Sequence, residues 1–283
     1  IGTFWVDDTI NLAAGVNLTG DGEIKLVDNV GWEVGKTMFS ASGLDDITIT
    51  GITVDGNSQG NTDVPFGKGY YALFEFHRCS NVLFDDVTLE YGKSDGIIFR
   101  NGKHITVTNC IINKMGHEGL YSLYSDYVIF SNNTVSTRTN SACRISSGAH
   151  ILISQNEVYS HDITSADGGG SSTGPGFELD LDGSSEYAYY IEICNNYIQD
   201  LEGSAIWMTS ANDNSQGVYI HNNIIKDVGQ YRYDNKYSTA GITIFQFNST
   251  LIENNVFDDT GIAGIRHAQS VDAETSSTFK TIV

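Results

Sequence analysis

Hydrophobic and polar residues repeat along this chain with a period of 23 residues. Three segments show the pattern most clearly, with apolar residues at alternating positions followed by polar ones: residues 105–112, 128–135 and 151–158. The β-branched and aromatic residues predict short β-strands, and the Asn, Gly and Asp residues that follow predict corners. A fixed period of this length is typical of a solenoid, in which each coil buries its apolar face against its neighbour. We therefore predict an all-β solenoid with coils of about 23 residues, in a single domain over residues 1–283.

The coils are not all of equal length. Aligned on Ile105, they place equivalent residues at Ile47, Val82, Ile105, Val128, Ile151, Ile191, Val218 and Thr250. Wherever the spacing exceeds 23 residues, we expect the excess to leave the cylinder as a loop. Such loops are predicted around residues 55–69, 161–176 and 230–239, and loops on a regular scaffold commonly carry binding sites.

Charge and composition narrow the possible partners. The formal net charge of −20 argues against nucleic acid, because a phosphate backbone needs a basic face. An acidic polysaccharide stays open as a partner, since a local group of Arg and Lys would hold acidic sugars.

No apolar run reaches the roughly 18 residues that a membrane helix needs, so we predict no membrane span. The sequence sets no expectation for the oligomeric state. We expect the chain to be a fragment of a longer protein, because no capping segment flanks the coils.

Cysteine and asparagine residues both have structural interpretations. The four cysteines, Cys79, Cys110, Cys143 and Cys194, form no Cys-x-x-Cys pair, which favours buried free thiols over a disulfide or a metal site. Five asparagines share one corner of the repeat: Asn133, Asn156, Asn196, Asn223 and Asn255. Stacked Asn side chains hydrogen-bond between coils, so we predict a structural ladder.

A third strand in each coil begins with a small residue and then alternates. Its outward residues, taken coil by coil, are Glu75, Ile98, Tyr121, Arg144, Glu178, Trp207, Thr243 and Arg266. A second outward column, two residues further on, comprises His77, Arg100, Leu123, Ser146, Asp180 and Thr209. Because stacked strands lie about 4.8 Å apart, each column is predicted to form a continuous row of side chains.

Acidic and basic residues in these rows are the candidate catalytic groups. Glu178 and Asp180 lie two apart on one strand, a spacing that suits the two carboxyls of a glycoside hydrolase. The alternative is a solvated acidic strand, or a weak surface ion pair between Glu178 and Arg144. Arg144 is suited to bind a uronate carboxylate, or to act as the base of a lyase if it can lose its proton. The predicted catalytic residues are Glu178, Asp180 and Arg144.

Neighbouring side chains complete the predicted site. Tyr121 and Trp207 would be exposed aromatics that stack on sugar rings. His117, at a corner beside the row, would transfer protons near neutral pH or simply be solvated. The predicted substrate-binding residues are Tyr121, Trp207, Arg100, His117, Glu118 and Asp182. Asp180 and Asp182 could offer oxygens to Ca²⁺, but the chain lacks a calcium-binding loop or repeat, so no metal and no cofactor is predicted.

The sequence resembles a known group of enzymes. The opening Leu-Ala-Ala-Gly-Val-Asn-Leu-Thr-Gly-Asp-Gly of residues 12–22, the Asn-rich coils and the Gly-Ile starts of the third strands are similar to those of right-handed parallel β-helix enzymes that act on polysaccharides. That group includes pectate lyases, polygalacturonases and alginate epimerases. The acidic, Asn- and Tyr-rich coils look most like the disaggregatases of methanogenic archaea, which break down the matrix polysaccharide between cells.

This resemblance implies a right-handed parallel β-helix that is secreted or held at the cell surface and cuts an acidic, amino-sugar-containing polymer. The polygalacturonase Asn-Thr-Asp and Gly-His-Gly motifs are missing, so no residue roles carry over from that family. Three functions stay open: a glycoside hydrolase, a lyase with Arg144, Tyr121 or His117 as its base, and a noncatalytic glycan-binding solenoid.

Overall fold

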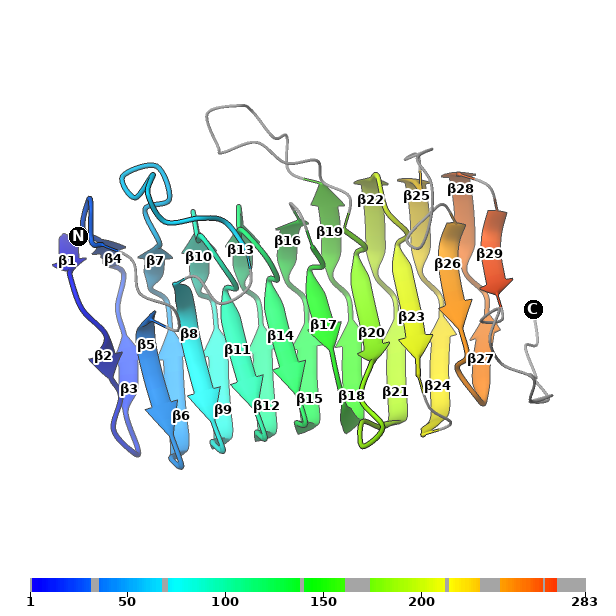
Figure 1. The fold of residues 1–283 in the computed structure, drawn as a ribbon, viewed down its shortest axis with the longest axis horizontal. Helices are drawn as coiled ribbons and strands as arrows, with labels where there is room; N and C mark the ends of the chain where they lie inside the picture. Colours follow the sequence, from blue (N-terminus) through cyan, green and yellow to red (C-terminus); the bar gives the residue numbers. More distant parts are fainter. Residues whose placement is uncertain are drawn as a thin grey trace.

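The computed structural model is a single stack of parallel β-strands arranged in three sheets (Figure 1). It describes residues 2–31, 36–67, 71–137, 140–160, 174–211, 214–229, 240–261 and 263–268. Each of the first nine coils contributes one strand to each sheet, the last described coil contributes β28 and β29, and β1 and β29 lie at opposite ends of the stack. The described residues form no helix, and hence none that could cross a membrane.

Among the described residues, sheets 1 and 2 each contain ten strands, and sheet 3 contains nine. The strands of sheet 1 are β1 (Thr3–Val6), β4 (Glu23–Leu26), β7 (Thr53–Asp55), β10 (Thr88–Glu90), β13 (Ile111–Asn113), β16 (Thr134–Thr137), β19 (Glu157–Ser160), β22 (Tyr197–Leu201), β25 (Ile224–Val228) and β28 (Val256–Thr260). The strands of sheet 2 are β2 (Ile10–Asn11), β5 (Thr37–Ser42), β8 (Ala72–His77), β11 (Ile97–Arg100), β14 (Leu120–Leu123), β17 (Cys143–Ile145), β20 (Phe177–Leu181), β23 (Ile206–Ser210), β26 (Ala240–Phe245) and β29 (Ala263–Ala268). The strands of sheet 3 are β3 (Asn17–Thr19), β6 (Asp45–Thr50), β9 (Ser80–Asp85), β12 (Lys103–Thr108), β15 (Asp126–Ser131), β18 (Gly148–Ser154), β21 (Ala188–Cys194), β24 (Ser215–His221) and β27 (Thr250–Glu253).

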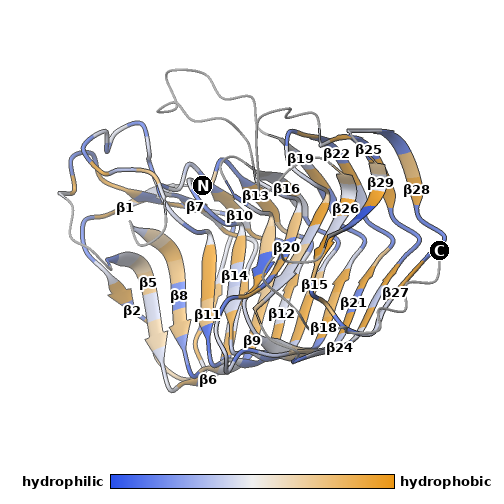
Figure 2. Cartoon of the chain, turned by 45° about the vertical axis from the view of Figure 1, so that its right-hand side comes forward, coloured by the Kyte–Doolittle hydropathy of each residue, from blue (hydrophilic) through white to orange (hydrophobic). Residues whose placement is uncertain are grey.

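The strand register is the one that the repeat predicts. In sheet 3, each residue aligned on Ile105 pairs with its predicted equivalent in the next coil, from Ile47 to Thr250. Inward residues of all three sheets fill one continuous hydrophobic core, which includes stacked phenylalanines such as Phe39 and Phe74, with ring centroids 4.6 Å apart. Figure 2 shows these hydrophobic residues as bands that recur across neighbouring strands.

Small residues precede the strands of sheet 2 because the next coil passes very close there. A Cβ atom on Gly119 would lie 2.5 Å from the carbonyl oxygen of Ala142, and one on Gly176 would lie 2.6 Å from that of Ala205. Any larger side chain pointing at that carbonyl would push the coils apart. The small residue that marks each third strand in the sequence is therefore a packing requirement.

The predicted asparagine ladder is confirmed. The Oδ1 atom of Asn196 accepts the backbone N–H of Asn156 at 2.9 Å and its side-chain N–H at 3.0 Å, while its own Nδ2 donates to the carbonyl of Ile153 at 3.0 Å. Asn133, Asn156 and Asn223 make equivalent bonds. The residue before each ladder position adopts a left-handed backbone, for example Asn195 with φ 56. The column thus provides hydrogen-bond partners for the buried polar groups of one corner.

Removing one rung of this ladder should destabilise the protein. In Asn196→Ala, the buried N–H of Asn156 and carbonyl of Ile153 lose their partners, so we expect the free energy of unfolding to fall by about 2–4 kcal/mol. Asn195→Gly is the matched control, because glycine tolerates the left-handed backbone and Asn195 is exposed. Denaturant unfolding of both variants measures the difference, and equal stabilities would contradict a structural role for the ladder.

The predicted loops and the predicted state of the cysteines can also be compared with the structure. Residues 56–67 leave the cylinder between β7 and β8 as expected, whereas residues 161–173 and 230–239 of the other two predicted loops lie outside the described residues. All four cysteines are buried free thiols, as predicted.

Candidate active site

Both predicted side-chain columns lie on the outward face of sheet 2. The first runs in register from Glu75 through Ile98, Tyr121, Arg144, Glu178, Trp207 and Thr243 to Arg266. In the second, Arg100 pairs with His77 and Leu123, and Asp180 pairs with Thr209. The three predicted catalytic residues therefore meet on adjacent strands β17 and β20.

Arg144 lies at the centre of three carboxyl groups. Its NH1 is 3.6 Å from Oε1 of Glu118, its Nε is 3.6 Å from Oε1 of Glu178, and its NH2 donates to Oδ2 of Asp180. Nε also donates to Oγ of Ser146 at 3.1 Å. We name Glu118, Arg144, Glu178 and Asp180 the Arg144 cluster. One guanidinium thus faces three acids, which leaves the cluster with an excess of negative charge unless protons are bound.

The corner that leads into sheet 2 continues the cluster. Asp95, Glu118 and Ser141 occupy equivalent positions in three successive coils. Asp95 accepts the backbone N–H of Glu118 at 3.0 Å, and Glu118 accepts that of Ser141 at 2.8 Å. Nδ1 of His117 lies 2.7 Å from Oδ1 of Asp95. The hydroxyl of Ser141 donates to Glu118 and lies 3.2 Å from Oε2 of Glu178. The corner and the strand therefore share one hydrogen-bond network.

Asn140 and Ser141 were not among the predicted site residues, although the repeat contains the signal that identifies them. They lie 23 residues after His117 and Glu118, so they occupy the same corner one coil later. Nδ2 of Asn140 lies 3.0 Å from Nε2 of His117 and also donates to Glu118. Both residues position the groups that were predicted.

The expectation of exposed aromatic residues is wrong. Tyr121 is 4% exposed and Trp207 is 9% exposed. Tyr121 is enclosed by two guanidiniums, those of Arg100 at 5.7 Å and Arg144 at 5.5 Å from its ring centroid, and it packs with Ile98. Trp207 contacts Phe245 edge-on, with ring centroids 6.4 Å apart. Alternation predicts which face a side chain occupies, but not what packs over that face.

Burial also bears on Glu118 and on the alternative interpretation of the acidic strand. Glu118, predicted to bind substrate, is completely buried with both oxygens bonded inside the protein. The strand that carries Glu178 and Asp180 is not a solvated acidic edge, because these residues are 6% and 5% exposed. Their ion pairs with Arg144 are buried, and buried pairs cost much more to break than surface pairs.

The remaining predicted residues surround the cluster. Arg100 is half-buried, and its Nε donates to Oε1 of Glu75 at 3.0 Å. Asp182 is exposed and directly follows β20. The side chains of His117 and Arg144 retain 13% and 15% exposure, so they mark the side from which solvent reaches the cluster.

Burial makes the acids of the cluster hold protons more tightly than usual. Burial, opposed by Arg144 and reinforced by Glu178 and Asp182, raises the pKa of Asp180 to about 7. Burial likewise raises the pKa of Glu178, and burial together with Glu178 and Asp95 raises the pKa of Glu118 well above its ordinary value. Burial opposes the charge of Arg144, but the three carboxylates outweigh it and its pKa lies above the ordinary value. Arg144 is thus poorly suited to act as a base, whereas Asp180 is suited to hold a proton near neutral pH.

These shifts predict a stability that depends on pH. An acid whose pKa is raised on folding binds protons more tightly in the folded state, so its contribution is fully present below the unfolded pKa and is lost as pH rises through the folded pKa. For Asp180 the loss falls between pH 3.8 and about 7. Across this pH range, the unfolding free energy should fall by roughly 1–4 kcal/mol less in Asp180→Asn than in Asp200→Asn. Asp200→Asn is the control because Asp200 is exposed. Urea unfolding at several pH values measures this, and parallel pH curves would contradict the assignment.

The stacked coils and their parallel sheets define a β-helix, and comparison with a family model identifies it as right-handed. The family model of the right handed beta helix region matches residues 14–165 and 72–257. The chain belongs to this family, and the predicted right-handed parallel β-helix is confirmed. No curated protein sequence matches the chain.

Solved structures with the same fold include proteins with different activities. The surface protein and adhesin PfbA of Streptococcus pneumoniae is 11% identical, with a TM-score of 0.60 and coverage of 94% of this chain and 89% of its own. The polygalacturonase of Erwinia carotovora ssp. carotovora is 13% identical, with a TM-score of 0.57 and coverage of 99% and 87%. The A-module of a mannuronan C-5 epimerase of Azotobacter vinelandii is 15% identical, with a TM-score of 0.50 and coverage of 92% and 84%. At these identities the likeness concerns the fold alone.

Proposed function

We propose that this protein is a glycoside hydrolase that cleaves an acidic heteropolysaccharide, with Asp180 as general acid and Glu178 as its partner carboxylate. The observation that carries the proposal is the pair of buried carboxyl groups held by one guanidinium on the outward face of sheet 2. Such a pair, with pKa values raised by burial, supplies the proton that a departing sugar oxygen needs.

Asp180 is the better candidate for the acid. Its Oδ2 accepts from Arg144, whereas its buried Oδ1 has no hydrogen-bond partner among the residues that the structure describes. A buried acceptor without a partner is costly, so its retention supports a functional role for that oxygen. In the proposed reaction, Asp180 gives its proton to the glycosidic oxygen and Glu178 acts on the opposite side of the bond, as the base for a water or as a nucleophile.

Arg144 has a different role from the one expected. Its donors are engaged by Ser146 and the three carboxyl groups, so we assign it to positioning Glu178 and Asp180 rather than to binding a sugar carboxylate. His117, held by Asp95 and Asn140, lies at the accessible edge, so we assign it to contacting the substrate. Tyr121 and Trp207 would form the buried floor of the site instead of exposed stacking platforms.

The identity of the polymer rests on the sequence resemblance. The disaggregatase-like coils support an acidic, amino-sugar-containing matrix polysaccharide as substrate and a secreted or cell-surface location. The polygalacturonase and the mannuronan epimerase with the same fold act on polysaccharides, which is consistent with a polysaccharide as the substrate.

A second candidate function is noncatalytic glycan binding. The burial of Glu178 and Asp180, whose side chains are only 7% and 6% exposed, favours it, because a reacting carboxyl must reach its substrate. The fold shared with an adhesin is consistent with this alternative. A lyase that uses Arg144 as its base is disfavoured, because the raised pKa of Arg144 opposes loss of its proton.

Incubation with an acidic, uronate-containing matrix polysaccharide distinguishes these functions. We expect the chains to shorten and new reducing ends to appear without the ultraviolet absorbance of an unsaturated uronate. Shortening with that absorbance would replace the proposal with a lyase. Binding without shortening, across a panel of acidic glycans, would replace it with a noncatalytic solenoid.

A further inference from the structure

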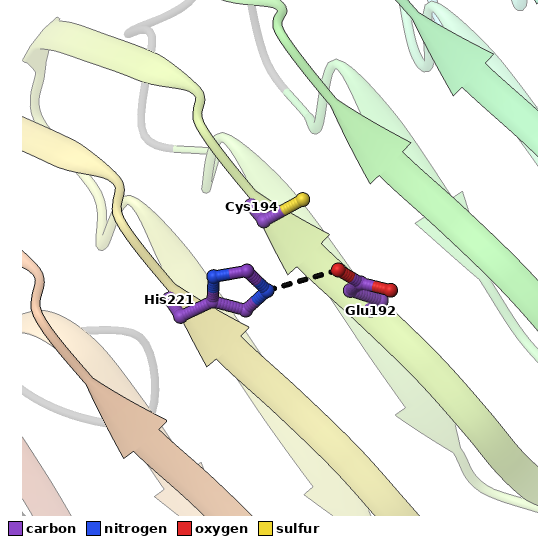
Figure 3. A group of neighbouring side chains, drawn as sticks. All are labelled: Glu192, Cys194 and His221. Carbon is purple, nitrogen blue, oxygen red and sulfur yellow. Dashed lines mark hydrogen bonds and ion pairs between the residues drawn. The ribbon is translucent and has the colours of Figure 1, made fainter.

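A second group of reactive side chains lies on the outward face of sheet 3, a different face from the Arg144 cluster. Glu192 and Cys194 come from β21, and His221 comes from the adjacent strand β24 (Figure 3). A carboxylate oxygen, the thiol sulfur and an imidazole nitrogen of these residues all lie within 4.8 Å of one another. Three donor atoms of different types thus converge on one point between two coils.

The sequence along this column shows that packing does not require these residues. The three preceding coils place small hydroxyl side chains at the same register position, Thr108, Ser131 and Ser154, and the coil before those places Asp85 there. Cys194 pairs with Ser154, and His221 pairs with Cys194. Within this column, a thiol and an imidazole occur only in the two coils beside Glu192, and Glu253 follows His221 in the next coil.

The imidazole of His221 is held in place from three sides. Its Nε2 lies 2.9 Å from Oε1 of Glu192, and its Nδ1 lies 2.9 Å from the side-chain amide of Asn222. The ring of Tyr219 stacks on it with centroids 4.0 Å apart, and the Tyr219 hydroxyl donates to Glu253. A ring fixed in this way presents Nε2 toward Glu192 and Cys194 with little freedom left to lose on binding an ion.

We propose that Glu192, Cys194 and His221 bind a zinc ion that joins two adjacent coils. A thiolate, an imidazole and a carboxylate together suit Zn²⁺, whereas Ca²⁺ and Mg²⁺ prefer oxygen ligands alone. Three protein ligands leave a fourth tetrahedral position for water. The side chains of His221 and Glu192 are 14% and 47% exposed, so an ion reaches them from solvent.

Binding requires two proton movements. The Cys194 thiol loses its proton to solvent as the sulfur coordinates zinc. His221 must offer the lone pair of Nε2, so its proton resides on Nδ1, where the Asn222 amide accepts it through its oxygen once the amide is turned. Asn222 is thereby assigned as the residue that fixes the tautomer of the ligand.

Zinc titration of the metal-free protein by calorimetry tests the proposal. We expect one ion per chain, with affinity lowered at least about 100-fold in Cys194→Ser and His221→Gln and unchanged in the control Cys110→Ser. Cys194→Ser should fold, because Ser154 fills the same position one coil earlier. Cobalt(II) provides a second readout, since the wild type should show thiolate-to-metal charge-transfer absorption that Cys194→Ser lacks.

Two results would overturn this assignment. One is the absence of stoichiometric zinc binding by the wild type. The other is binding that Cys194→Ser leaves unchanged, which would show adventitious attraction of cations to a chain with net charge −20. Both results come from zinc binding alone and do not depend on any activity of the protein on polysaccharide.

Discussion

Asp180→Asn should lower the turnover of polysaccharide by roughly 10²–10⁴-fold, which is the usual contribution of a general acid. Asparagine keeps the shape of the side chain and can still contact Arg144, but it has no proton to give the leaving oxygen. The loss should be much smaller on a substrate whose leaving group needs no protonation, such as an activated aryl glycoside. This dependence on the leaving group separates proton donation from a purely structural effect.

The matched control for this variant is Asp200→Asn. Asp200 is exposed on β22 in sheet 1, where its backbone is left-handed and tolerates asparagine. Turnover should stay at the wild-type level in the control, and circular dichroism should show that both variants are folded. Full turnover in Asp180→Asn would remove Asp180 from the mechanism, and equal losses on both substrates would remove its role as an acid.

Arg144→Met should cost about 3–5 kcal/mol of unfolding free energy, the largest stability effect that we expect of a single substitution in this chain. Methionine fills much of the same space but leaves Glu118, Glu178 and Asp180 buried without their cation. The variant should recover part of its stability as pH falls, because protonation removes the charges that Arg144 balances.

Arg100→Gln provides the comparison for this prediction. The Arg100–Glu75 pair is more exposed, with side chains 29% and 18% accessible, so its loss should cost only about 0–1 kcal/mol. Denaturant unfolding at neutral and mildly acidic pH measures both variants. Similar costs for the two substitutions, or a cost for Arg144→Met that does not change with pH, would show that the cluster is not the coupled group described here.

The repeat in the sequence predicts most of the fold. Because each coil of 23 residues stacks directly on the next, the spacing predicted the pairing of Ile105 with Val128. Where a coil is longer, alignment of the repeated pattern predicted the pairing of Arg144 with Glu178 and placed Asn196 in the corner ladder. Alternation along a strand has a period of two, so it also assigned the outward face correctly.

The environment of the site could not be predicted in the same way. Periodicity says that Tyr121 points out of the cylinder, but its burial depends on Arg100 and Arg144 folding over the ring. Similarly, Glu118 looks like a surface corner residue until Asn140 and Ser141 from the next coil close around it. Side-chain contacts of this kind depend on rotamers and neighbours, which a repeat pattern does not encode.

The central claim, hydrolysis by the carboxyl pair of Glu178 and Asp180, is tested most directly by isotope incorporation. The protein is incubated with the acidic polysaccharide in water enriched in heavy oxygen, and the products are weighed by mass spectrometry at early times. We predict one heavy oxygen at each new reducing end in the wild type and almost no product in Asp180→Asn. Products that lack the heavy oxygen and the mass of one water would contradict hydrolysis and establish elimination instead.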